Sequence, residues 1–147
     1  MRTFFLALLF ILTFLNPTKS DLSNNDNLQI KLKIVYPKQG TSLGSYYNVE
    51  NIIAIEVIND WKNSKKILSG KKLDEFKKIM KTCVYRIGLE TKPGHIFIKV
   101  KFKGESKWRN DFIYLNSAIN FDYGINKYGE KFSGTFRTSR NVNFEKY

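Results

Sequence analysis

The chain combines one segment of helical periodicity with several segments of strand periodicity, and this combination constrains its fold most strongly. Across residues 69–82 apolar side chains recur every three or four positions, which predicts one helix at about residues 70–82. Across residues 95–103 apolar and polar side chains alternate, which indicates a half-buried strand, with Phe97 as an apolar exception on the polar side. One helix among many strands predicts an α+β domain in which the helix packs on a mainly antiparallel sheet.

Further strands are expected on both sides of the helix. Their ranges are 28–36, 51–58, 66–68, 83–89 and 108–115, followed by one or two hairpins from residue 119 to the end. The stretch 51–58 is apolar on both faces apart from Glu56, so we expect it inside the sheet. Residues 38–48 contain Gly40 and Gly44 and are predicted to form a loop. Ser69 is the expected N-cap of the helix.

The N-terminus has the pattern of a secretory signal peptide. Arg2 precedes twelve residues that are apolar except for Thr13, and small residues follow at Thr18 and Ser20. A membrane-spanning helix needs roughly 20 apolar residues, so this run predicts cleavage after Ser20 rather than an anchor. We therefore expect residues 1–20 to be removed, residues 21–27 to form a flexible start, and residues 28–147 to form one domain. Such a protein is exported to the periplasm or the outside of a cell, and a bacterial source fits best.

Charge and cysteine content narrow the classes of partner. The chain carries a formal charge of +12, and removal of residues 1–20 takes away two cations and no acid, which leaves +10. Lysine supplies most of this charge, whereas nucleic-acid readers depend on arginine, and export also separates the chain from nucleic acid. The charge predicts a protein partner with an acidic face or an anionic envelope polymer. Cys83 is the single cysteine, so no intramolecular disulfide can form.

Catalytic and metal-binding patterns are incomplete in this sequence. Residues 40–44 match G-x-S-x-G around Ser42, but the expected helix and the larger scaffold of that motif are missing, and His95 lies in a predicted strand. The acids Glu105, Asp111 and Asp122 have no spacing that singles out a catalytic pair. One histidine and one cysteine are too few for a metal site. We therefore expect no enzyme activity, no metal and no cofactor.

Aromatic residues beside cations are the best candidates for binding. They are Trp61, Trp108, Arg109, Tyr46 and Tyr47. Amphipathic aromatics and arginine dominate protein–protein hot spots, although small β-rich domains also use large aromatics in their cores. The leading hypothesis is an exported, non-catalytic binding protein, such as an inhibitor or immunity-type protein that acts on a protein partner. A domain that binds envelope glycans or anionic lipids and a small hydrolase of envelope polymers are the alternatives.

Overall fold

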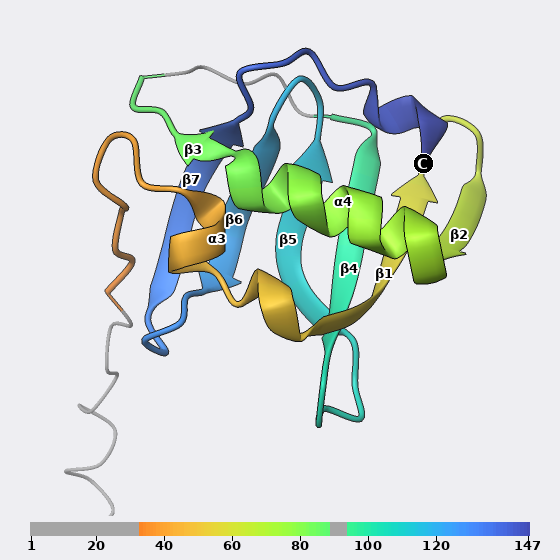
Figure 1. Ribbon diagram of the computed structural model, residues 1–147, viewed down its shortest axis with the longest axis horizontal. Coiled ribbons are helices and arrows are strands. Elements are labelled where there is room, and N and C mark those ends of the chain that lie inside the picture. The colour runs from red at the N-terminus through yellow and green to blue at the C-terminus, as the bar shows by residue number, and fades with distance from the viewer. Residues whose placement is uncertain (1–32, 89–93) are drawn as a thin grey trace, which may run out of the picture. The chain divides into compact units, whose positions relative to one another are not determined.

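A computed structural model describes residues 33–88 and 94–147, so the predicted signal peptide and flexible start lie outside the described residues. In the described part, the strands form one antiparallel sheet in the order β2-β1-β4-β5-β6-β7-β3 (Figure 1). The strands are β1 (Ile52–Asn59), β2 (Ser64–Leu68), β3 (Val84–Tyr85), β4 (Ile96–Phe102), β5 (Arg109–Leu115), β6 (Ile119–Ile125) and β7 (Lys131–Arg137). The helix and the sheet together confirm the predicted α+β class.

Helix α4 (Gly70–Thr82) connects the two edge strands of the sheet, β2 and β3, by crossing in front of the strands between them (Figure 1). Two short helices precede β1 and pack against α4: α3 (Leu43–Tyr46) and the 3₁₀ helix η1 (Val49–Asn51). A second 3₁₀ helix, η2 (Phe144–Lys146), lies close to the C-terminus. Its residue Phe144 and the terminal Tyr147 contact Phe76 of α4, so the end of the chain helps to cover the core.

The core lies between α4 and the face of the sheet that α4 covers. The helix contributes Leu73, Phe76 and Met80, and the strands contribute alternate residues. An aromatic group fills the side of the core near β6 and β7, and its rings lie within about 6 Å of one another: Tyr47, Phe121, Phe132 and Phe136. Burial of these apolar surfaces is the main stabilising contribution to the fold.

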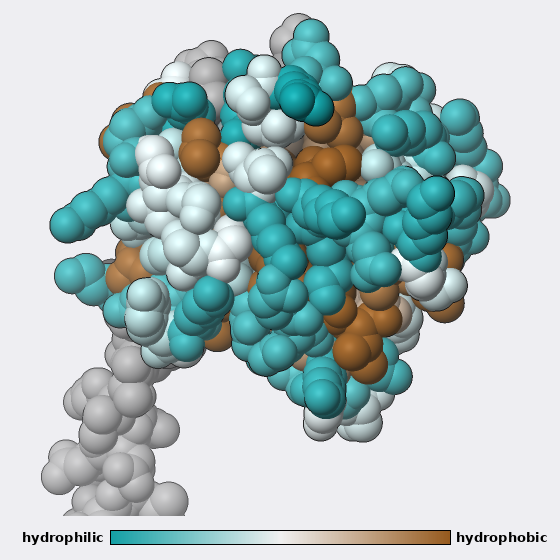
Figure 2. All heavy atoms as spheres, viewed as in Figure 1, coloured by the Kyte–Doolittle hydropathy of each residue, from teal (hydrophilic) through white to brown (hydrophobic). Residues whose placement is uncertain are grey.

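The opposite face of the sheet, here called the outer face, has no described helix over it. Strand residues that alternate with buried core residues point to this face, and several of them are large and apolar. Figure 2 shows the α4 side, where the surface is mainly hydrophilic and the apolar areas are separated by polar ones. An apolar sheet face exposed to water is a frequent mark of an interaction surface.

The structure differs from the sequence-based expectations at three segments. Residues 38–48, expected to be a loop, contain α3, which begins because the Ser42 hydroxyl accepts a hydrogen bond from the Ser45 N–H at 3.2 Å. Of the strand expected at 83–89, the described residues 83–88 contribute the two-residue β3, which pairs with the end of β7, and residue 89 lies outside the described residues. Of the strand expected at 28–36, the described residues contribute an isolated bridge from Val35 to Phe132, and the remainder lies outside the described residues.

Other expectations are confirmed. The predicted helix at 70–82 has the bounds of α4, and β1 lies between β2 and β4 as its apolar pattern indicated. Ser69 occupies the N-cap position of α4, but its side chain makes no capping hydrogen bond. The helix start is therefore fixed by packing of its apolar face rather than by a cap.

Candidate functional site

Strand β5 contains a bulge where it pairs with β4. Ile98 of β4 pairs with Ile113, whereas Val100 pairs with Arg109, so β5 holds extra residues between the two pairs. Within this bulge Phe112 has a φ of 48°, a left-handed conformation that is rare and costly for a bulky residue. Burial still alternates along β5, so Asp111 is buried on the core side and Phe112 is 53% exposed on the outer face.

A second bulge follows in β6, next to the first. The register of β6 with β7 shifts between Phe121 and Gly124, and the displaced Tyr123 is 52% exposed. The rings of Tyr123 and Phe112 meet edge to face, with centroids 5.9 Å apart. Each of the two adjacent strands is thus irregular at one member of an exposed aromatic pair, and bulges of this kind are common next to functional sites.

A shallow groove of about 320 Å³ lies beside this aromatic pair on the outer face. The side chains that line it come from β1, β4 and β5 and from the turn after β1: Ile58, Asp60, Phe97, Lys99, Asn110 and Phe112. We call the groove together with Tyr123 the aromatic groove. Phe97, the exception to the polar side of its strand, is 37% exposed and pairs with Ile58.

Lysines flank the aromatic groove on the β2 and β4 side. Lys65 pairs with Ile58, and Lys101 follows the groove residue Lys99 by two positions on the same face. The carboxylates near them are Glu56, which pairs with Lys99, and Asp60 at the groove end. The lysines outnumber these acids, so the rim of the groove favours negative charge on whatever binds there.

Beneath the β5 bulge, the Tyr47 hydroxyl donates a hydrogen bond to Asp111 Oδ2 at 2.6 Å. Both side chains are buried. Burial raises the pKa of the Asp111 carboxyl, and the Tyr47 hydrogen bond and the Arg109 charge oppose this rise. Burial also raises the pKa of Tyr47 well above its usual value, and the charge of Asp111 adds to the effect. The pair therefore holds the bulge in place from the core side.

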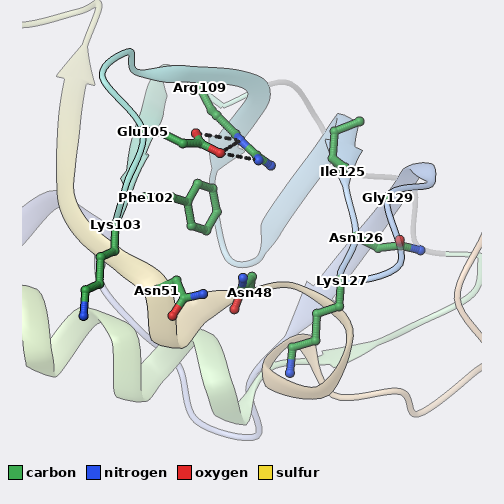
Figure 3. Close-up of a pocket in the computed structure, with 10 residues that line it drawn as sticks. All are labelled: Asn48, Asn51, Phe102, Lys103, Glu105, Arg109, Ile125, Asn126, Lys127 and Gly129. Carbon is green, nitrogen blue, oxygen red and sulfur yellow. Dashed lines mark hydrogen bonds and ion pairs between the residues drawn. The ribbon is translucent and has the colours of Figure 1, made fainter.

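A second depression, here called the end pocket, lies where β1 begins and β4 and β6 end (Figure 3). Its volume is about 280 Å³. Arg109 crosses it above the Phe102 ring, with the guanidinium carbon 4.6 Å from the ring centroid. Glu105 holds Arg109 through two guanidinium nitrogens at 2.5 and 3.0 Å, and this contact raises the pKa of Arg109. Asn48 lies on the other side of the same ring (Figure 3).

The predicted binding residues are distributed over different parts of the fold. Arg109 lines the end pocket, and Trp61, 80% exposed, follows the groove residue Asp60 at the opposite end of the sheet. Trp108 is half-buried. The Tyr46 ring is half-buried and packs edge-on against Phe132, and Tyr47 is fully buried rather than exposed. The structure thus brings Tyr47 and Arg109 together around Asp111 and leaves Trp61 elsewhere.

Trp61 is held in place by His95. The indole and imidazole rings stack with centroids 3.7 Å apart and planes 4° from parallel. His95 Nε2 lies 3.4 Å from a carboxylate oxygen of Glu145 in η2. The histidine thus joins the turn after β1 to the C-terminal segment, and Trp61 presents one face of its ring to solvent.

Sequence reasoning missed Phe112 and Tyr123 because both lie in stretches that resemble ordinary strands. Phe97 was the available signal, since a large aromatic on the polar side of an alternating strand indicates an exposed apolar position. The bulges themselves depend on non-local register and leave no local periodicity to detect.

The motif around Ser42 has a structural role in the described part of the chain. The Ser42 hydroxyl donates a hydrogen bond to Ser45 at 2.9 Å, whereas His95 contacts Trp61 and Glu145. Among the described residues, no group of three or more His, Cys, Asp or Glu side chains could hold a metal ion. The described helices include none that is long and apolar enough to cross a membrane.

Burial raises the pKa of the Cys83 thiol to about 12. Because the thiolate is the reactive form, we expect the folded protein to react with iodoacetamide at pH 8 roughly a hundredfold or more slower than the protein in urea. The measurement is the alkylated mass fraction over time. Equal rates in buffer and in urea would contradict the buried position of Cys83.

Comparisons with known protein families, with curated proteins and with solved structures find no match to this chain. Its function is therefore inferred from its own residues and their arrangement.

Proposed function

We propose that this chain is an exported, non-catalytic binding protein that docks a protein partner on the aromatic groove. The observation that carries the proposal is the large aromatic side chain of Phe112, which is 53% exposed on the outer face at a backbone position with a φ of 48°. Such a conformation costs about 1–3 kcal/mol and is kept where the exposed side chain has a use. A second bulge places Tyr123 against the same ring, so two independent distortions supply one surface.

The groove has the composition of a protein-binding hot spot. Aromatic rings at its centre offer apolar area at a low entropic cost, and charged side chains form its rim. The matching partner surface is an apolar projection surrounded by carboxylates, because Lys65, Lys99 and Lys101 flank the groove. The edge-to-face geometry of Phe112 and Tyr123, with planes 77° apart, does not give the flat platform on which a sugar ring stacks.

Site-specific crosslinking tests this proposal. A photoreactive benzoylphenylalanine in place of Tyr123 is expected to give one discrete adduct with a protein in the cells that make this chain. The matched control carries the same photoreactive residue in place of Tyr128, another exposed tyrosine, which lies in the turn before β7. This control is expected to give no such adduct. In the Lys65→Glu, Lys99→Glu, Lys101→Glu background the adduct is expected to disappear, because the rim then repels an acidic partner.

Several outcomes would overturn the proposal. They are no adduct at position 123, the same adduct at positions 123 and 128, and an adduct that survives the reversal of the three lysine charges. An adduct of twice the chain mass would identify a second copy of this chain as the occupant and would overturn the assignment of an acidic partner. Peptide mapping of the adduct distinguishes these cases.

Replacing Phe112 by Gly separates binding from stability. Glycine tolerates a positive φ, so the variant is expected to be as stable as the wild type or more stable by about 1 kcal/mol, while the crosslink from position 123 is lost. Phe97→Gly is the matched control, because Phe97 lies in regular strand and its loss should destabilise by about 1 kcal/mol. Urea unfolding measures both, and a strongly destabilised Phe112→Gly would show that Phe112 is structural.

A further inference from the structure

The end pocket contains polar groups that the fold itself does not use. Among the described residues, the side-chain amides of Asn48 and Asn51 and the Lys103 ammonium have no hydrogen-bond or ion-pair partner, and all three line the pocket. The Nε and one terminal nitrogen of Arg109 donate hydrogen bonds to Glu105, and the second terminal nitrogen has no partner among the described residues. The pocket therefore holds several uncommitted polar groups within one small volume.

The structure also fixes the most strongly charged of these groups, the Arg109 guanidinium, in advance. Arg109 is held by the two-point contact with Glu105 and by the Phe102 ring below it, so its orientation is set before a ligand arrives (Figure 3). Asn48 is the N-cap residue of η1 and Asn51 is its last residue, and Val49 between them is buried in the core. Pre-ordered groups lose little conformational entropy on binding, which favours recognition of a small ligand.

The types of group in the pocket define the class of ligand. An asparagine amide both donates and accepts hydrogen bonds, which matches the double character of a hydroxyl group. Arg109 and Lys103 are cations and attract a carboxylate, while Lys127 is engaged with the Gly44 carbonyl at 2.8 Å. Glu105 neutralises part of this charge, so one carboxylate is the anion that fits. The volume of about 280 Å³ equals roughly nine water molecules, which suits one sugar ring.

We infer that the end pocket is a binding site for a carboxylated sugar unit of the uronic-acid class. Its carboxylate lies against Arg109, and its hydroxyls bond with Asn48 and Asn51. This site lies at the end of the sheet and shares none of its residues with the aromatic groove. The two proposals therefore stand on separate observations, and either can fail alone.

Titration of the isotope-labelled chain with galacturonate, followed by nuclear magnetic resonance, tests the inference. We expect saturable shifts of the Asn48 and Asn51 side-chain amide signals. Galactose, which lacks the carboxylate, and acetate, which lacks the hydroxyls, are each expected to bind at least several-fold more weakly. Equal binding of acetate would overturn the inference, since it would show a simple anion site, and so would equal binding of galactose or no shift up to the solubility limit of galacturonate.

Variants locate the binding in the pocket. Asn48→Ala with Asn51→Ala is expected to weaken galacturonate binding roughly tenfold, because two hydrogen-bonding groups are lost. Lys103→Gln is expected to reduce the preference for galacturonate over galactose. Asn110→Ala, an exposed asparagine of the aromatic groove beside Arg109 in sequence, is the matched control and should bind as the wild type does. Unchanged affinity in the Asn48, Asn51 double variant would overturn the inference, and Phe112→Gly should bind galacturonate normally.

Discussion

Replacing Tyr47 by Phe is expected to lower the free energy of unfolding by about 3 kcal/mol at pH 7, because the buried Asp111 carboxylate loses the Tyr47 hydrogen bond and keeps the one from the Ile125 backbone. The substitution removes one oxygen atom and leaves the ring in place against Phe121 and Phe132. Lost packing therefore contributes little, and the cost measures the isolation of the charge. Equilibrium unfolding in urea gives the value.

The same variant is expected to show a distinctive pH dependence. Burial raises the folded-state pKa of Asp111 above its ordinary value of about 4, and loss of the Tyr47 hydrogen bond raises it further. A raised acid pKa favours the protonated form in the folded state, so the stability it contributes is fully present below the unfolded pKa. That stability is lost as the pH rises through the folded pKa. The cost of Tyr47→Phe is thus smaller at pH 4 than at pH 7.

Asp111→Asn is the control for this prediction. The amide oxygen can still accept a hydrogen bond, and the buried charge is gone, but the amide group replaces the second acceptor oxygen that Asp111 offers to Tyr47 and the Ile125 backbone. We expect this variant to be destabilised by about 1–2 kcal/mol at pH 7, less than Tyr47→Phe, and to lose the contribution of Asp111 to the acid-range pH dependence. A Tyr47→Phe cost that is the same at pH 4 and pH 7 would contradict the assignment to the Asp111 charge.

The sequence predicted the regular parts of the fold because their signals are local. Helix α4 and strand β4 each bury one face, and a repeat of 3.6 or 2 residues records which side chains belong to that face. The position of β1 inside the sheet could likewise be predicted, because a strand that is almost entirely apolar on both faces is typical of the interior of a sheet, where other strands pair with both of its edges. In these segments the burial of individual residues follows from the pattern alone.

The proposed binding surface could not be predicted in the same way, because the pairing of the strands that carry Phe112 and Tyr123 is irregular there. The bulges at Phe112 and Tyr123 exist only relative to the register of the neighbouring strands, which a single sequence does not display. Tyr47 is an example of burial that the sequence did not predict. It lies in a segment predicted to be a loop, yet it is buried because α3 and η1 fold that segment onto the core.

The sequence around Trp61 indicates that its side chain can be exposed, but it does not indicate how the ring is oriented. Trp61 lies in a polar turn, where no local pattern requires burial, and its side chain is 80% exposed. Its orientation depends on His95, which lies 34 positions away along the chain and at the start of β4. The pairing of β1 with β4 brings the two rings together, so the contact is a product of sheet topology.

Replacing Phe132 by Ala is expected to have the largest effect on stability, a loss of about 3–5 kcal/mol of unfolding free energy. The Phe132 ring is fully buried and contacts the rings of Tyr46, Phe121 and Phe136. Removal of the ring leaves a cavity among side chains that are themselves held by the β6 and β7 backbones, so the site cannot collapse fully.

Gly124 lies directly against this ring and provides a sharper test of the packing. A Cβ added at Gly124 would lie 2.5 Å from Phe132 Cε1 and 2.8 Å from Phe121 Cδ1, both too close for an unshifted contact. Gly124→Ala is therefore expected to cost about 1–3 kcal/mol in the wild type through overpacking. Gly124 is the residue at which the β6 bulge ends. Because it has no side chain, the Phe132 ring can fill the core next to the bulge that exposes Tyr123.

The two substitutions should be strongly non-additive. In the Phe132→Ala background the added methyl group enters space that the ring has vacated, so Gly124→Ala should cost at least about 1 kcal/mol less than in the wild type. The residual cost reports the second contact, with Phe121. A double-mutant cycle from urea unfolding measures this coupling, and strict additivity would show that Phe132 does not restrict position 124. The coupling would tie the aromatic core on one side of the sheet to the bulge that exposes Tyr123 on the other.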